Sequence, residues 1–297
     1  MKKKFLLLIC FVTVLLFSVQ AQKGTVDQLM GYTSKSDSVG WSFSGLVGLT
    51  FGQTSLTNWS AGGDNTISGD FMLNASANYL KNKWFWDNNL FGEYGMIYSS
   101  SYDWRKSTDK INFTSVAGHG ISSQWSVSLL LNFRTQLAKG YDYPNTDNYI
   151  SGLMVPGYSN AALGFTYKPN AKYTVFLSPV TERATFVLDK YLSGNGKFGV
   201  NPGEKVKWET GAYVRATTNQ TIAPNLSLIS TLDMFTSYSE NFGNIDINWD
   251  ILLSYKINKL LTTTLNTTLR HYDAEIQKLQ FKEVFGLGFT YNFNSKK

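Results

Sequence analysis

The sequence has little charge, almost no histidine and a single cysteine. Of its 297 residues, 16% are charged, two are histidine, and Cys10 is the one cysteine. A disulfide scaffold and a thiolate metal site need more than one cysteine, so both are excluded. Soluble globular chains carry roughly 25% charged residues, so a cytosolic composition fits poorly. The 17 Tyr, 8 Trp and 25 Gly, spread through alternating sequence, argue equally against disorder.

Long hydrophobic runs are missing after the first 21 residues. Lys2 to Lys4 precede an apolar run from Phe5 to Phe17, and Ser18 to Ala21 supply small side chains before a cleavage point. This pattern predicts a secretory signal peptide over residues 1–21. Its apolar run is about 13 residues, short of the roughly 20 that a membrane-spanning helix needs, and no later run is longer. We therefore expect no transmembrane helix in the mature chain.

The positive charge is also small once the leader is removed. Without Lys2 to Lys4 the chain has 24 basic against 21 acidic residues, and the basic ones form no cluster. A nucleic-acid interface needs such a cluster, so we expect no nucleic-acid partner. Two separated histidines and no mature thiol leave no ligand set for zinc, and we expect no metal or other cofactor.

What the chain does have is an alternation of large apolar residues with small or polar ones. In the last segment Phe285, Leu287 and Phe289 alternate with Gly286, Gly288 and Thr290. A period of two predicts strands with one apolar face. The pattern predicts about twelve strands, at 41–51, 66–79, 84–98, 110–121, 124–138, 159–168, 172–180, 205–219, 225–238, 245–257, 260–272 and 281–293.

Short turns alternate with longer connections between these strands. The longer segments lie at 52–65, 99–109, 139–158, 181–204, 239–244 and 273–280. Most of the strands are long enough to cross a bilayer when tilted. The sequence thus predicts an all-β fold, a transmembrane antiparallel up-and-down β-barrel over 41–293 in the outer membrane. We expect a short periplasmic segment at 22–40, a tail at 294–297, and both termini in the periplasm.

Aromatic residues near the strand ends support a membrane barrel. Trp41, Trp84 and Trp125 lie beside short turns, whereas Trp208 and Tyr272 lie towards the longer connections. Membrane barrels carry two such girdles where the wall meets the lipid headgroups, so outer-membrane lipid is an expected partner. A secreted β-sandwich would also alternate, but its strands are shorter and its loops lack this asymmetry, so the barrel is favoured.

The positions opposite the apolar face are strongly polar. Their charged members, the candidates for lining the lumen, are Asp70, Glu93, Arg134, Glu209, Arg215, Asp233, Asp250 and Arg270. Either these charges pair across the lumen and fill it, or they line a hydrated path for a small hydrophilic solute. Eight-stranded barrels are filled and porins of sixteen to eighteen strands are open, so about twelve strands do not decide between the two.

Catalysis is a weaker hypothesis. His119 is expected on the lipid face, and His271 lies at the outer end of its strand. A hydrolase triad could use His271, but no nucleophile motif such as Gly-x-Ser-x-Gly accompanies it. We expect that the chain is not an enzyme and retain a barrel hydrolase as an alternative.

The loop from Phe51 to Asn65 offers candidates for contact with an outside ligand. They are Asn58, Trp59, Asp64 and Asn65. An aromatic ring can stack on a sugar while amides and a carboxylate hydrogen-bond to it. The favoured alternative is that Trp59 anchors a folded loop in the barrel mouth.

This loop also carries a resemblance to a known family. The pattern Gln-x5-Trp-x2-Gly-Gly from Gln53 to Gly63, together with 164–170, 177–180 and 196–200, resembles a Bacteroidota outer-membrane β-barrel family of unknown function. The resemblance implies a barrel in the outer membrane but supplies no activity or ligand. The last strand, Gly286 to Phe293, resembles the signal of outer-membrane barrels for their assembly machinery, which is therefore an expected partner.

These observations predict a passive porin-like channel for small hydrophilic solutes. The alternative is a non-conducting structural or accessory barrel in secretion or surface assembly, with an unidentified protein partner. The charged lumen is compatible with both, since it can conduct or be filled by its own pairs.

Overall fold

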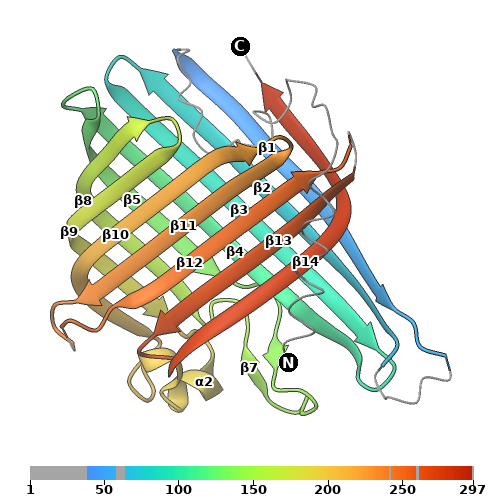
Figure 1. Cartoon of the computed structure of the whole chain (residues 1–297). Coiled ribbons are helices and arrows are strands. Elements are labelled where there is room, and N and C mark those ends of the chain that lie inside the picture. The colour runs from blue at the N-terminus through green and yellow to red at the C-terminus, as the bar shows by residue number, and fades with distance from the viewer. Residues whose placement is uncertain (1–38, 58–63, 241, 259–260, 296–297) are drawn as a thin grey trace, which may run out of the picture.

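The computed structural model describes residues 39–57, 64–240, 242–258 and 261–295. The predicted leader and nearly all of the 22–40 segment lie outside the described residues, as do Asn58 and Trp59. Twelve strands form one closed antiparallel barrel, in which neighbours in sequence pair and β1 closes onto β14 (Figure 1). The predicted antiparallel up-and-down barrel is therefore confirmed.

The barrel strands are β1 (Gly40–Thr54), β2 (Thr66–Lys81), β3 (Trp84–Ser99), β4 (Asp103–Gly120), β5 (Trp125–Thr135), β8 (Gly157–Asn170), β9 (Tyr173–Phe186), β10 (Val206–Ala223), β11 (Leu226–Ser237), β12 (Asp246–Lys256), β13 (Leu261–Tyr272) and β14 (Ile276–Ser295). Between β5 and β8 lies a small hairpin of β6 (Gly140–Tyr141) and β7 (Tyr149–Ser151), and between β9 and β10 lie the short helices α2 (Lys190–Gly194) and η2 (Lys197–Gly199). Within the described ranges, no helix has the length and apolar character to span a membrane.

Three strands extend five to seven residues beyond their predicted limits at one end. β4 begins at Asp103 rather than 110, β14 begins at Ile276 rather than 281, and β9 continues to Phe186 rather than 180. The segments 99–109 and 273–280, predicted as long loops, are therefore mostly strand, joined by short turns. The outward rows of these ends mix polar and apolar residues, as Asp109, Lys106 and Trp104 do in β4, so the apolar signal is interrupted even though the backbone ladder continues. In β9 a bulge near Pro179 also shifts the outward row by one residue.

Large apolar side chains cover the outside of the wall. Trp84 is 61% exposed, Leu163 57% and Phe285 71%, and ten of the twelve barrel strands carry such residues, the exceptions being β11 and β13. His119 belongs to this surface, with its ring centroid 4.6 Å from that of Trp84. Soluble monomers rarely expose apolar patches above a few hundred Å², so this belt is a lipid-facing surface.

Both described ends of the barrel lie at the end with the short turns. Gly40 pairs with Leu80 beside one such turn, and Ser295 pairs with Phe43. The helix α2 and the β6–β7 hairpin lie at the opposite end, which we call the long-loop end (Figure 1). That the short-turn end faces the periplasm stays a prediction.

Candidate functional site

The register of the barrel places all eight predicted lumen residues on the inward face. Directly opposed residues of an antiparallel pair share a face. Arg215 opposes Asp233 in the pair of β10 and β11. Arg270 opposes Asn248, and Asn248 and Asp250 are neighbours in the inward row of β12. Asp70 lies over Gly95 and accepts a hydrogen bond from Thr108 Oγ1 at 3.0 Å. Glu209 pairs with Lys207 at 3.3 Å.

One ion pair spans the full width of the lumen. Lys110 Nζ lies 2.7 Å from Asp250 Oδ2. Lys110 is on β4 and Asp250 on β12, six strands apart in either direction around the barrel. Asp250 also accepts hydrogen bonds from Thr268 Oγ1 at 2.6 Å and Asn248 Nδ2 at 2.8 Å. Its carboxylate is thus fixed by three donors.

A second bridge crosses beside this pair. Glu93 on β3 accepts a hydrogen bond from Asn266 Nδ2 at 3.2 Å and lies 3.7 Å from Lys282 Nζ. These partners belong to β13 and β14, so the contacts cut across the lumen rather than along the wall. The predicted candidates Glu93 and Asp250 therefore both take part in bridges.

Arg134 extends from β5 towards β12 and β13. It donates to Asn248 Oδ1 at 3.2 Å and to the hydroxyl of Tyr272. Its guanidinium also lies over the rings of Tyr158 and Tyr272, at 4.9 and 5.2 Å from their centroids. Tyr272 was predicted to belong to the outer aromatic girdle, and this is wrong. Tyr272 shares its parity in β13 with the inward residue Arg270, so it points inward, where its hydroxyl meets Arg134.

Two further arginine contacts lie towards the long-loop end. Arg270 pairs with Glu275, which also accepts a hydrogen bond from Tyr158 Oη at 2.5 Å. Burial alone would raise the pKa of Glu275, but the charge of Arg270 lowers it below the ordinary value of 4.5. Arg183 pairs with Asp246, and its guanidinium lies 3.6 Å from the ring centroid of Phe235.

An apolar cluster fills part of the lumen. Leu130, Ala162, Phe176, Tyr213 and Phe235 come from five consecutive strands, and each is at most 3% exposed. The sequence interpretation treated the inward rows as polar and missed this cluster. The signal was available for Leu130, because it shares its parity in β5 with the inward residues Ser128 and Asn132.

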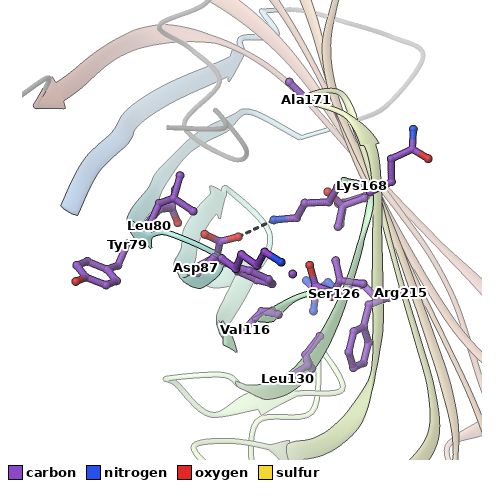
Figure 2. Close-up of a pocket in the computed structure, with 18 of the residues that line it drawn as sticks. Tyr79, Leu80, Asp87, Val116, Ser126, Leu130, Lys168, Ala171 and Arg215 are labelled. Atoms are coloured by element: carbon purple, nitrogen blue, oxygen red, sulfur yellow. Dashed lines mark hydrogen bonds and ion pairs between the residues drawn. The ribbon is translucent and has the colours of Figure 1, made fainter. Parts of the chain in front are cut away.

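Between this cluster and the short-turn end lies a cavity of about 430 Å³ (Figure 2). Leu130, Val116 and Phe176 line its deep end, and the turns at 82–83, 122–124 and 169–171 line its mouth. Lys168 Nζ reaches across it to Asp87 Oδ2 at 2.8 Å. The sequence analysis predicted neither the cavity nor a role for Lys168, because no local sequence pattern shows that side chains of β8 and β3 meet in the lumen.

Two long loops pack together at the opposite end. Val155 from one loop contacts Val187, Leu192 and Val200 from the other, with each residue at most 4% exposed. Asp189 caps α2 by accepting hydrogen bonds from the amides of Tyr191 and Leu192, each at 2.9 Å. The Tyr149 hydroxyl donates to the same carboxylate, and this hydrogen bond lowers the pKa of Asp189 below its ordinary value of 3.8.

The other predicted positions have local roles in the described structure. Asp64 accepts a hydrogen bond from Ser101 Oγ at 2.5 Å, and Asn65 Oδ1 accepts one from the Leu56 amide at 2.6 Å. Both contacts lie within the loops at the rim. His271 opposes Ile247 on the outward face, so it points away from the lumen. In the part of the chain that the structure describes, no three His, Cys, Asp or Glu residues gather as a metal site would require.

Comparison with known proteins adds a partial family match. The model of a family described as protein of unknown function (DUF3078) matches residues 51–141. This confirms the resemblance to a family of unknown function for the part of the chain from the end of β1 to β6. The match carries no activity, and a Bacteroidota origin stays a prediction. A comparison with curated proteins finds no match.

Solved structures that resemble this chain include a channel, a porin and a translocator domain of outer-membrane barrels. An outer membrane channel from Pseudomonas putida F1 gives a TM-score of 0.41 at 11% identity, covering 92% of this chain and 100% of that chain. The NanC porin gives 0.39 at 8% identity, covering 83% and 98%. The translocator domain of the autotransporter NalP from Neisseria meningitidis gives 0.38 at 8% identity, covering 87% and 90%. At these sequence identities and TM-scores, the likeness carries no conclusion about the function of this chain.

Proposed function

We propose that this chain is an outer-membrane channel for small hydrophilic solutes whose lumen is closed at rest by charged pairs that span it. The observation that carries the proposal is the Lys110–Asp250 ion pair, which joins opposite sides of the barrel. A polar lumen inside an apolar wall supports a channel, and the bridges made by Glu93 and Arg134 support closure.

The exposure of the pair supports a closure that can open. The side chains of Lys110 and Asp250 are 20% and 25% exposed, so both keep part of their hydration. Fully exposed pairs contribute about 0–1 kcal/mol, whereas breaking a buried pair costs about 3–5 kcal/mol. A pair between these limits holds the lumen closed yet separates at a moderate cost in free energy.

The proposed location is the outer membrane, reached by export with the predicted leader, with the short-turn end in the periplasm. The apolar belt supports insertion in a bilayer. The predicted contact of Gly286 to Phe293 with the barrel-assembly machinery belongs to the same proposal. It is supported by the exposed outward row that includes Phe289 and Tyr291.

Single-channel recording in a planar bilayer tests the proposed closure. Wild type should give a sealed bilayer with rare brief openings, and Lys110→Gln should raise the open probability about tenfold, since this corresponds to the loss of roughly 1.4 kcal/mol of closing free energy. Lys81→Gln removes the same charge at the exposed end of β2 and should leave the recording unchanged.

Two results would contradict the proposal. Steady wild-type conductance would mean an open porin, and a sealed Lys110→Gln barrel, folded by heat-modifiable gel migration, would mean that the pair is not the barrier. The second result would favour the alternative of a non-conducting accessory barrel. That alternative is supported by the apolar cluster around Leu130 and Phe176, which does not depend on Lys110.

A further inference from the structure

The cavity at the short-turn end has the size and lining of a binding site for a small molecule. Its volume of about 430 Å³ lies within the usual range for ligand pockets, roughly 300–1,000 Å³. Its lining combines apolar residues with the inward polar residues Asn78 and Asn89. Such a division suits a ligand with an apolar body and a polar head.

The apolar part of the lining consists of side chains from four strands. Phe85 comes from β3, Val116 from β4, Leu130 from β5 and Phe176 from β9. Leu130 and Phe176 are at most 3% exposed and are held from below by the lumen cluster. The deep end is therefore an apolar surface backed by the buried lumen cluster.

The charges in the lining favour a single negative charge on the ligand. The lining includes the cations Lys83, Lys168 and Arg215 and one carboxylate, Asp87. Arg215 is paired with Asp233 below the cavity wall, with 3.6 Å between Nε and Oδ1, and Asp87 balances Lys168. With Asp233 counted, three cations face two carboxylates around the cavity, so its charge sums to +1.

Lys168 is placed to hold the head of such a ligand. Its ammonium lies 4.6 Å from the ring centroid of Phe85 as well as 2.8 Å from Asp87. The side chains of Lys168 and Asp87 are 38% and 34% exposed, and ion pairs so open to solvent contribute little. A ligand carboxylate can thus replace or join Asp87 at Lys168 (Figure 2), while its apolar body lies against the partly exposed side chains of Phe85 and Val116.

We propose that this cavity binds small monocarboxylates with an aromatic or branched apolar body. The site opens at the short-turn end and needs no conducting lumen, so the proposal does not depend on the channel activity. A free solute rather than a membrane lipid is the proposed occupant, because the cavity lies on the inward side of the wall.

Calorimetric titration of the folded barrel in zwitterionic nanodiscs tests this, with 4-phenylbutyrate as the probe and empty nanodiscs as the blank. We expect saturable binding to wild type. Lys168→Gln and the neutral probe 4-phenylbutyramide should each weaken it about tenfold, as expected for loss of one charge-assisted hydrogen bond. Lys172→Gln, a charge change on the same turn but outside the lining, should have no effect.

A second variant covers the case in which Lys168→Gln does not fold. Ser126→Phe places a ring in the cavity from β5 and should abolish binding. Absence of saturable binding to folded wild type, or equal affinities for Lys168→Gln and Lys172→Gln, would overturn the proposal. Loss of binding when phosphatidylglycerol is added to the nanodiscs would identify a lipid headgroup as the occupant and overturn the assignment to a free solute.

Discussion

Leu129 and Leu130 are neighbours in β5 and meet different surroundings. Leu129 is 46% exposed in the outward apolar belt, whereas Leu130 is fully buried in the lumen cluster. Alternation along the strand predicts that they point in opposite directions. It does not predict that an inward position is packed by apolar neighbours, because those come from strands up to about 100 residues away in the chain.

The two leucines give a matched pair of substitutions. Leu130→Ala should lower the free energy of unfolding by about 2–5 kcal/mol, because it leaves a hole among rigid neighbours. Leu129→Ala should cost only about 1–2 kcal/mol, since lipid chains fill the space that it vacates. Urea unfolding in lipid vesicles measures both. Equal losses would mean that Leu130 is not packed in a core.

The charged residues of the lumen were predicted better than their partners. Alternation alone selected inward positions such as Glu93, Arg134 and Asp250. It missed Lys110, which lies at the limit of the predicted strand 110–121, and Arg183, which lies beyond the predicted strand 172–180. Which inward charges meet depends on how the closed barrel sets β4 against β12, and no local pattern contains that information.

Among the elements, β14 has an unusual environment. It pairs with β13 from Ile276 to Phe289, but with β1 only from Leu287 to Ser295. Within the described ranges, residues 278–286 therefore lack a strand partner on one edge. At the paired end closure is tight, since a Cβ atom at Gly288 would lie 2.0 Å from the Leu49 carbonyl oxygen.

This asymmetry predicts uneven hydrogen exchange along β14. Amides without a ladder partner exchange faster, so peptides covering 278–286 should exchange about half of their amides quickly. Peptides covering 287–293 should stay protected. Mass spectrometry of deuterium uptake in nanodiscs measures the difference, and uniform protection along β14 would show that another strand covers the edge.

The contact between the two long loops should depend on pH. The pKa of Asp189 is lowered in the folded state, so the contact is fully stabilised above the ordinary value of 3.8 and is lost as the pH falls through the folded value. Pepsin should therefore cut the loop 187–205 faster at pH 2 than at pH 4, relative to a model peptide of the same sequence. Asp189→Asn should remove this pH dependence. An unchanged ratio in wild type would contradict the role of the carboxylate.

At the scale of the whole molecule, the strand number, the antiparallel order and the outward belt could be predicted from alternation. The strand limits at 110 and 281 could not be predicted, because the outward rows beyond them, at the long-loop end, mix polar residues such as Asp109 and Lys106 with apolar ones. The sequence did not decide whether the lumen is filled or hydrated. In the structure, bridges from Lys110, Glu93 and Arg134 cross the lumen, and an apolar cluster lies beside them.

The central claim is that attraction between opposite charges closes the lumen. The most direct test is the single-channel conductance of three barrels, Lys110→Asp, Asp250→Lys and the double variant that combines both changes. Each single variant places like charges opposite each other, so we predict frequent openings, whereas the double variant restores opposite charges and should seal the bilayer as wild type does. A double variant that conducts as often as the single variants would contradict closure by this ion pair.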